Sequence, residues 1–362
     1  MTFQFEAHPK RSLEKLAPYE ALPSGVDLPR GDLVVMNANE SPYGPSPRAL
    51  EGALGALKGG VNRYPDPSAR DLTGALSAHW GVEEDRILVD NGLDGVITLL
   101  GITFLEEGDQ VLHGEVTFSV YKSLAMRLGA VSVPVPMGDR WELDLEGFLQ
   151  RIADRTRLVF VCNPNNPTGT LVSHRRMEEF MSRVPRRVLV VSDEAYGDFA
   201  GDDLPRTLEL MERYPNLIMM RTFSKAYGLA GLRVGYLIAH PSVVMAMRRA
   251  KEPYGVNAVA LGAALGALED REHLRRTVEA LLEGRRFLEE GLERLKVPFV
   301  RSHANFVFMP LGDRAGDVFR GLVARGVLVR LFDSLGAIRV SVGTPKENLA
   351  FLKALSEVIC DE

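Results

Sequence analysis

The sequence predicts an α/β fold: a large domain with a mainly parallel central sheet covered by helices, followed by a smaller α+β domain. Three observations lead to this class. The chain has 362 residues, which favours one large and one small domain over a single core. From about residue 70, apolar runs with β propensity alternate with amphipathic segments. After about residue 257 the pattern changes to long helices and then to short strands.

The alternation places the expected elements along the chain. In the first region, strands are expected at residues 87–89, 110–113, 131–135, 158–162, 188–192, 217–221 and 234–238, with helices at 95–105, 120–128, 145–152 and 174–182. In the second region, we expect helices at 257–268, 272–295 and 346–359 and strands at 305–309, 327–330 and 337–342. Residues 1–45 lack sustained periodicity, apart from a short helical possibility at 12–16. The predicted organisation is an arm (1–45) that associates with the small domain, a large domain (46–256) and a small domain (257–362).

Composition limits the classes of function. Apolar residues make up 46% and charged residues 25%, as in a folded globular protein. A net charge of −5 gives no basic field for a polyanion, so nucleic acid is not expected as a partner. Two cysteines do not indicate a disulfide framework, and the first residues contain no apolar run. We therefore expect a cytoplasmic protein that does not cross a membrane. The seven histidines show no ligand spacing, and no metal is expected.

The loop T-F-S-K-A-Y-G-L-A-G-L-R-V-G at residues 222–235 has the composition of a phosphate-binding site. Its glycines permit close approach of a ligand, and Thr222, Ser224 and Arg233 can donate to a phosphate. Lys225 stands out because the chain has 9 lysines against 34 arginines. A lysine, unlike an arginine, can bond covalently to an aldehyde. A surface loop with an incidental lysine is the alternative. The nucleotide motifs G-x-x-x-x-G-K-[ST] and G-x-G-x-x-G do not occur here, which argues against ATP and NAD.

Two further loops place polar side chains where expected strands end. Asp193 follows the expected strand 188–192, where α/β enzymes position site residues, although a helix N-cap is an alternative role. A carboxylate there could pair with the ring nitrogen of pyridoxal phosphate (PLP), with Tyr196 hydrogen-bonded to the ring oxygen. The loop N-P-N-N-P-T-G at 163–169 follows the expected strand 158–162. Its composition is typical of any turn, but Asn166 could also donate to the ring oxygen.

In this order, N-P-N-N-P-T-G, D-E-A-Y at 193–196 and S-K-x-x-G-L-x-G-x-R-x-G at 224–235 resemble the fold-type I PLP-dependent aminotransferases. Within that group, N-A-N-E-S-P-Y-G-P at 37–45, R-Y-P-D at 63–66 and I-R-V-S-V-G-T at 338–344 resemble the histidinol-phosphate aminotransferases, over about residues 16–350. The resemblance implies transfer of the amino group of L-histidinol phosphate to 2-oxoglutarate in histidine biosynthesis. The products would be imidazole acetol phosphate and glutamate, and the enzyme would be a homodimer with shared sites.

The resemblance also implies roles for individual residues. The catalytic residues would be Lys225, Asp193 and Tyr196. The cofactor would be bound by backbone N–H groups of Leu93 and Asp94, by Phe118 stacked on the ring, by Asn166, Thr222, Ser224 and Arg233, and by Tyr64 of the other subunit. The substrate would be bound by Tyr19, Asn39, Tyr254, Arg330 and Arg339, with Arg339 on the α-carboxylate.

Some features depart from the family or leave alternatives open. Gly95 stands where the family commonly has an acidic residue, and the stretch 330–336 between the two arginines is compressed, so the orientation of Arg330 stays open. An aromatic or broad-specificity aminotransferase and a phosphothreonine decarboxylase share the same motifs. A more distant alternative is a non-enzymatic PLP-binding regulator. The roughly 30 residues before the first motif are too few for the DNA-binding module that such a regulator needs.

Overall fold

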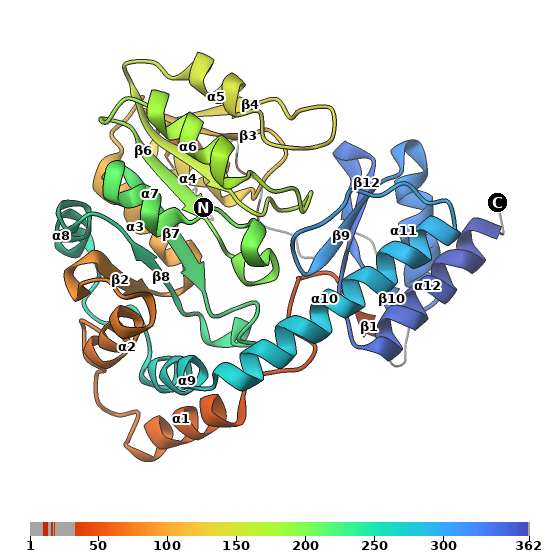
Figure 1. The fold of residues 1–362 in the computed structure, drawn as a ribbon, viewed down its shortest axis with the longest axis horizontal. Helices are drawn as coiled ribbons and strands as arrows, with labels where there is room; N and C mark the ends of the chain where they lie inside the picture. Colours follow the sequence, from red (N-terminus) through yellow and green to blue (C-terminus); the bar gives the residue numbers. More distant parts are fainter. Residues whose placement is uncertain (1–9, 14–15, 17, 19–32, 361–362) are drawn as a thin grey trace, which may run out of the picture.

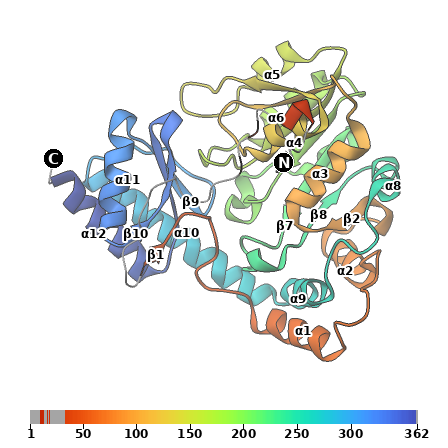
Figure 2. The same ribbon diagram turned by 180° about the vertical axis from the view of Figure 1, so that it is seen from behind.

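The computed structural model describes residues 10–13, 16, 18 and 33–360, and its centre is a seven-stranded sheet with the order β2-β8-β7-β6-β5-β3-β4 (Figures 1 and 2). The strands are β2 Ile87–Asp90, β3 Gln110–Gly114, β4 Val131–Val135, β5 Thr156–Cys162, β6 Leu189–Asp193, β7 Leu217–Thr222 and β8 Gly235–Ile238. Neighbouring strands are parallel except where β8 pairs with β2 and β7. The predicted mainly parallel sheet is confirmed.

Helices cover both faces of this sheet, which explains why its inner strands are nearly continuous apolar runs. Alternate residues of β5 enter different hydrophobic clusters: Val159 and Val161 join one, Leu158 and Phe160 the other. The covering helices are α2 Arg70–Trp80, α3 Gly92–Phe104, α4 Val120–Leu128, α5 Leu145–Arg151, α6 His174–Arg183, α7 Thr207–Arg213, α8 Pro241–Ala250 and α9 Ala258–Glu269. The helices expected in this region therefore form, close to the expected bounds.

A second, three-stranded antiparallel sheet has its own hydrophobic cluster, which includes Phe306, Phe319 and Phe351. Its order is β11-β12-β9, with β9 Phe306–Pro310, β11 Arg330–Phe332 and β12 Ala337–Ser341. The helices beside it are α10 Arg271–Arg294, α11 Ala315–Ala324 and α12 Pro345–Cys360. In Figure 1, α10 runs from α9 across to this unit. The expected smaller α+β unit is present, while the domain boundaries at 45 and 256 stay a prediction.

One expected strand was wrong in its extent. The segment predicted as a single strand at 327–330 forms β10 Val327–Leu328, which pairs in parallel with β1 Val34–Val35, and then β11, which pairs with β12. Val329, buried between them, marks the change of partner. The apolar pattern indicates β structure but does not say which neighbour each residue pairs with. Part of the predicted arm is thereby paired with the second unit, through β1.

The helix α1 Pro47–Lys58 was not among the expected elements. It packs closely on α9, because a Cβ atom at Gly52 would lie 2.1 Å from the carbonyl oxygen of Gly262. Its leucines Leu50, Leu54 and Leu57 remain 52%, 54% and 48% exposed. Helical periodicity is present in this segment, but its leucines do not face the core of its own chain, whereas Ala49 on the other side does.

Among the helices of residues 33–360, none combines the length and the apolar character needed to cross a bilayer. The longest of them, α10, has 24 residues but is strongly amphipathic, with charged side chains along its exposed side. Its apolar side, with Leu281, Leu288 and Leu292, packs into the hydrophobic cluster of the second sheet.

Candidate active site

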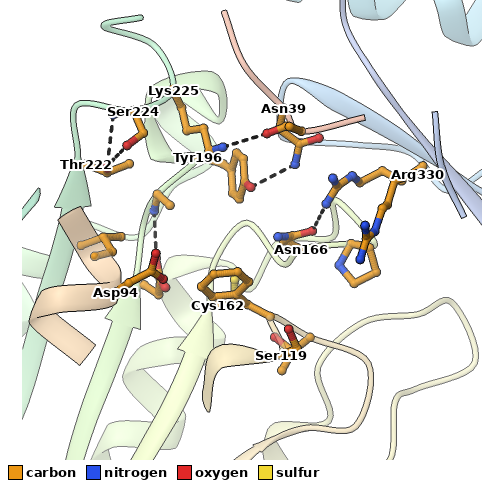
Figure 3. A pocket seen from close by; sticks show the side chains of 18 of the residues that line it. Asn39, Asp94, Ser119, Cys162, Asn166, Tyr196, Thr222, Ser224, Lys225 and Arg330 are labelled. Atoms are coloured by element: carbon orange, nitrogen blue, oxygen red, sulfur yellow. Dashed lines mark hydrogen bonds between the residues drawn. The ribbon is translucent and has the colours of Figure 1, made fainter. Parts of the chain in front are cut away.

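A cavity of about 320 Å³ lies at the carboxyl ends of the parallel strands, between the two sheets (Figure 3). This edge is where α/β folds place their ligands. Most of the predicted site residues line it: Asn39, Leu93, Asp94, Phe118, Asn166, Asp193, Tyr196, Thr222, Ser224, Lys225, Arg233, Arg330 and Arg339. Tyr64 and Tyr254 do not line it, and Tyr19 lies outside the described residues.

Asp193 ends β6 and is only 2% exposed. The Tyr121 hydroxyl donates to its Oδ2 at 2.6 Å, and the Ala195 N–H donates to its Oδ1 at 3.1 Å. Loss of solvation raises the pKa of Asp193 to about 6, although both hydrogen bonds act in the opposite direction. A cationic N–H group in the cavity would offset this loss and keep the carboxylate ionised. Asp193 is therefore suited to pairing with such a group.

Tyr121 is a residue that the sequence reasoning missed. Its ring stacks on Phe160 with centroids 4.3 Å apart and an interplanar angle of 8°, which fixes the hydroxyl beside Asp193. Burial raises the pKa of this phenol well above its usual range, so it stays a donor. Tyr121 and Asp193 are 72 residues apart in the sequence, and the sequence carries no signal that joins them.

Lys225 lies in the loop after β7, with its amine in the same cavity. Nζ donates to the Ala38 carbonyl oxygen at 3.1 Å and lies 5.7 Å from the centre of the Tyr196 ring. Burial, together with the nearby Arg339 cation, lowers the pKa of this amine to about 8. A larger fraction of the amine is therefore neutral, which is the form that attacks a carbonyl carbon.

The hydroxyls and the guanidinium of the 222–235 loop converge at one end of the cavity. Thr222 Oγ1 donates to Ser224 Oγ at 3.0 Å, and Arg233 Nη1 donates to the same Oγ at 3.2 Å. Arg233 Nη2 forms an ion pair with Asp94 Oδ2 at 3.1 Å. These donors form an anion-binding cradle, defined here as Thr222, Ser224, Arg233 and the first turn of α3.

The first turn of α3 contributes backbone donors to the cradle. Its N-cap residue, Asn91, makes no side-chain capping bond, so the first N–H groups of the helix can bind an anion. Two glycines make the close approach possible. A Cβ atom at Gly92 would lie 2.6 Å from Arg233 Nη2, and one at Gly235 would lie 2.8 Å from the carbonyl carbon of Gly92.

At the opposite end, two arginines enter the cavity from the second sheet. Arg330 and Arg339 are direct partners in the antiparallel pair β11–β12, so their side chains project from the same face. Arg339 donates to the carbonyl oxygen of Asn37 at 2.7 Å and to Oδ1 of Asn166. Its guanidinium also lies 5.3 Å from the ring centre of Phe306. Arg339 thereby links the 37–39 segment with the 163–169 loop.

Two of the predicted residues lie on the surface. Tyr64 and Tyr254 stack on one another with centroids 4.4 Å apart, and they are 80% and 46% exposed. Neither reaches the cavity of its own chain. Tyr64 was expected to act at another subunit, but Tyr254 was expected on the substrate side without that condition. Within one chain, the structure does not bring Tyr254 to the substrate side, because it lies on the exposed loop after α8.

Several lining residues were not predicted: Asn37, Ala38, Thr117, Ser119, Cys162, Pro167, Ala195 and Phe332. Most are neighbours of predicted residues within the same motifs, so the motif itself was the available signal. Phe332 has no such signal, because its place depends on the β11–β12 pairing. Burial raises the pKa of the Cys162 thiol to about 12, so it stays protonated in the cavity wall.

His113 and Glu115 are close in the sequence and both could bind a metal ion, but the His113 ring makes hydrogen bonds within β3 and to β4 instead. Its Nδ1 contacts the Gly114 carbonyl oxygen at 2.7 Å, and its Nε2 contacts Ser132 Oγ at 2.8 Å. Within the described part of the chain, no group of three His, Cys, Asp or Glu side chains is arranged to hold a metal ion.

The family model of aminotransferase class I and II matches residues 31–355. The chain belongs to the class I and II aminotransferases. It is 42% identical over 345 residues to the histidinol-phosphate aminotransferase of Akkermansia muciniphila, a match that covers 94% of each chain. It is also 42% identical over 332 residues to that of Symbiobacterium thermophilum, covering 91% of each. The crystal structure of histidinol-phosphate aminotransferase from Sinorhizobium meliloti in complex with pyridoxal-5'-phosphate has a TM-score of 0.85 and 30% identity, over 91% of this chain and 92% of that one.

The cofactor of this aminotransferase is pyridoxal 5'-phosphate, and the cavity fits it. PLP has a phosphate, a pyridine nitrogen and an aldehyde on one small ring. The cavity offers an anion-binding cradle, the buried carboxylate of Asp193 and the amine of Lys225 within one space. The groups packed around Gly92 and Gly235 leave no room for a side chain at these two positions of the cradle. Each functional group of PLP therefore has a chemically matched partner among the lining residues.

Proposed function

We propose that this aminotransferase transfers the amino group of L-histidinol phosphate to 2-oxoglutarate, giving imidazole acetol phosphate and glutamate, as a step of histidine biosynthesis. The observation that carries the proposal is the placement of Arg330 directly opposite Arg339, with both side chains in the cavity. Two guanidinium groups near one amine suit a phosphorylated donor and a dicarboxylate acceptor, since guanidinium binds both anions through paired hydrogen bonds. Curated relatives at 37–42% identity carry this activity in their names.

Three residues are proposed to hold the ring of the cofactor. When bound, PLP supplies an electron sink for the electrons left at the substrate Cα after proton removal. Asp193 pairs with the pyridine nitrogen and keeps it protonated, while Phe118 packs on the ring. Asn166 donates to the ring oxygen through Nδ2, because its Oδ1 already accepts from Arg339.

The proposed phosphate site is the cradle. The N–H groups of Leu93 and Asp94 at the start of α3 bind the phosphate together with Thr222, Ser224 and Arg233. In the structure, Arg233 is already oriented toward this end by its ion pair with Asp94. The cradle therefore presents its cation without further rearrangement of the loop.

Lys225 is proposed to anchor the cofactor covalently. After the substrate amine has displaced it, the free Nζ of Lys225 would take the proton from the substrate Cα and deliver it to C4′ of the cofactor. Its lowered pKa of about 8 suits this work near neutral pH. Tyr196 donates to the ring oxygen. Arg339 holds the α-carboxylate of 2-oxoglutarate, and Arg330 holds the phosphate of the donor, which lacks a carboxylate.

The proposal extends to a homodimer with shared sites. Leu50, Leu54 and Leu57 are spaced i, i+4, i+7 along α1 and form an exposed apolar stripe. A second copy of the chain covers this stripe. Tyr64 then reaches the phosphate of the partner's cofactor, and Tyr254, stacked on it, comes to the partner's substrate side. The stacked tyrosines thus contribute to the cavity of the partner subunit and not to that of their own chain.

The assembly is tested by placing a charge in the apolar stripe. Leu54→Asp buries a carboxylate in the proposed interface and is expected to shift the mass in multi-angle light scattering from dimer to monomer. Leu349→Asp is the matched control, because Leu349 is 60% exposed on α12, far along the chain from the stripe. A dimer that both variants leave intact would contradict the stripe as the interface.

The domains and the location complete the proposal. We place the arm at residues 1–45, the large PLP-binding domain at 46–256 and the small domain at 257–362. The cytoplasm is the proposed location, supported by two free cysteines, one buried at 162 and one exposed at 360.

The substrate is tested with a panel of amino donors at fixed 2-oxoglutarate: histidinol phosphate, phenylalanine and phosphothreonine. We expect the highest kcat/KM with histidinol phosphate. A clear preference for phenylalanine would favour the aromatic aminotransferase, which shares the whole cofactor side. Release of CO2 from phosphothreonine without consumption of 2-oxoglutarate would favour the decarboxylase. A coupled assay that measures glutamate formation distinguishes transamination from decarboxylation.

A further inference from the structure

Asn39 joins the two sheets at the cavity wall (Figure 3). It is 1% exposed and has a left-handed backbone, with φ of 55°. Its backbone N–H donates to Ser341 Oγ at 2.8 Å, and its Nδ2 donates to Tyr196 Oη at 3.0 Å. Ser341 Oγ in turn donates to Asn39 Oδ1 at 3.1 Å. Ser341 lies on β12 of the second sheet, whereas Tyr196 follows β6 of the first.

The hydrogen bond from the Asn39 backbone N–H favours one direction for each of the other two hydrogen bonds, because that arrangement gives the buried Ser341 hydroxyl hydrogen an acceptor. A backbone N–H can only donate, so Ser341 Oγ must accept from Asn39. The single hydroxyl hydrogen of Ser341 is then left for the other contact, with Asn39 Oδ1. This assigns the amide of Asn39, with its oxygen toward Ser341 and its NH2 group toward Tyr196. In the opposite assignment Ser341 Oγ would accept from both N–H groups of Asn39, and its own buried hydrogen would lose the acceptor that it has in the described structure.

The same logic continues into Tyr196. Its Oη accepts from Asn39 Nδ2, so its own hydrogen points to another acceptor. Tyr196 lines the cavity. Burial raises the pKa of its phenol to about 12, which keeps that hydrogen in place at neutral pH. The hydroxyl is therefore a donor directed by Asn39.

We infer that Asn39 and Ser341 are positioning residues that force Tyr196 to donate its hydroxyl hydrogen into the cavity, toward the ring oxygen of the cofactor. The inference rests on the proposed role of Tyr196 beside that oxygen. It replaces the expectation that Asn39 binds substrate, because both ends of its amide are engaged by protein groups. It also makes the donor direction dependent on how the second sheet sits against the first, since Ser341 belongs to β12.

The decisive variant is Asn39→Asp. Aspartate tolerates the left-handed backbone as asparagine does, so the fold is expected to persist. Its carboxylate only accepts, so the Tyr196 hydroxyl turns toward position 39 and no longer donates into the cavity. The readout is the pH midpoint at which the visible absorbance band of the bound cofactor shifts. A donor to the ring oxygen stabilises its anionic form, so losing the donor raises this midpoint.

A double-mutant cycle separates the donor effect from the added charge. We expect Tyr196→Phe to raise the midpoint by about one pH unit. Asn39→Asp should raise it by at least as much. In the Tyr196→Phe background, the rise in the midpoint caused by Asn39→Asp should be about one pH unit smaller than in the wild type. The rise that is left is the effect of the added charge alone. Additive shifts would overturn the inference and leave the role of Tyr196 standing. No shift in Tyr196→Phe itself would overturn that role and, with it, the inference.

Ser341 gives a second, uncharged test. Ser341→Ala removes the group that assigns the Asn39 amide, and the midpoint should rise by less than in Tyr196→Phe. Ser341→Thr keeps a hydroxyl and should restore the wild-type midpoint. The melting temperature of each apoprotein is measured in parallel. A lower melting temperature for Ser341→Ala with an unchanged midpoint would show a structural role only and would overturn the inference for Ser341.

Discussion

The cofactor side and the substrate side of the cavity are built differently. On the cofactor side, Asp193, Lys225 and the cradle all lie at the strand ends of one sheet. The substrate side joins Arg330 and Arg339 of the second sheet with the segment 37–39. The first arrangement is fixed by the register of neighbouring strands, the second by the way two sheets meet. Cofactor affinity and substrate choice should therefore respond to different substitutions.

Both sides depend on Lys225, and its loss should have the largest effect. Lys225→Ala removes the proposed covalent anchor and proton carrier, so kcat/KM should fall by at least about 10³-fold. The absorbance of the protein-bound cofactor should change at the same time. Lys353→Ala, an exposed substitution on α12, is the control and should change neither. Full turnover with an unchanged spectrum in Lys225→Ala would end the proposed mechanism.

Asp193 should show opposite effects on stability and on activity. Burial raises its pKa to about 6 from 3.8, so the folded apoprotein holds this proton over a range in which the unfolded chain has lost it. Wild-type stability therefore falls as pH rises from about 4 to about 6 and stays lower above that range. Asp193→Asn removes this loss and should stabilise the apoprotein by about 3 kcal/mol above pH 6.

Urea unfolding of both apoproteins at pH 4 and pH 8 checks the stability effect, since the difference should be absent at pH 4. Asp85→Asn, on the exposed turn before β2, should give no difference at either pH. In the cofactor-loaded enzyme, Asp193→Asn should lower kcat, because the neutral amide no longer pairs with a protonated ring nitrogen. Equal stability of wild type and Asp193→Asn at pH 8 would contradict the raised pKa.

The two arginines should separate the two substrates. Arg330→Ala removes the proposed charge-assisted hydrogen bonds to the donor phosphate, so the KM for histidinol phosphate should rise about 10- to 100-fold. The KM for 2-oxoglutarate should rise less, because Arg339 still holds its α-carboxylate. Arg339→Ala should show the reverse pattern, and Arg330→Lys should recover part of the loss. Two-substrate steady-state kinetics check this. Equal changes in both KM values for both variants would show that the arginines bind each substrate together.

The smallest effect is expected in the cradle. Ser224→Ala removes one of several proposed donors to the cofactor phosphate, so the Kd for PLP should rise about 10-fold or less. The KM values for both substrates should stay unchanged, because Ser224 belongs to the cofactor side alone. Equilibrium titration of the apoprotein measures Kd. Ser182→Ala, whose hydroxyl donates to Glu179 on the surface, is the control.

The same difference explains how much of the site could be predicted from the sequence. Asp193, Lys225 and the cradle residues sit in short motifs that follow predicted strands, and parallel strands bring such ends to one edge. Residue spacing and side-chain chemistry therefore predicted Asp193, Lys225, Thr222, Ser224 and Arg233, which the structure brings to one cavity, whereas the first turn of α3 and Phe118 came from the resemblance. The contact of Tyr121 with Asp193 was not accessible, because it depends on the packing of α4 against β5.

The substrate side was less accessible for a physical reason. Arg330 faces Arg339 because β11 and β12 pair in one register, closed by Gly336 with φ of 56°. The apolar pattern suggested one strand at 327–330 and gave no register. Asn39 was assigned to substrate by resemblance, while its left-handed backbone and its two partners emerge only from the fold. Contacts between distant segments were thus the part that motifs did not supply.

The reversed direction of β8 has a consequence for the chemistry. Gly235, the first residue of β8, pairs with Asp90 at the end of β2 and with Thr222 at the end of β7. A strand of four residues spans about 13 Å. If β8 ran parallel to β2 and β7, Arg233 would lie at the opposite edge of the sheet, away from the cradle. Because β8 is antiparallel to both of its neighbours, the 222–235 loop places the Arg233 guanidinium at the edge of the sheet where the cavity lies.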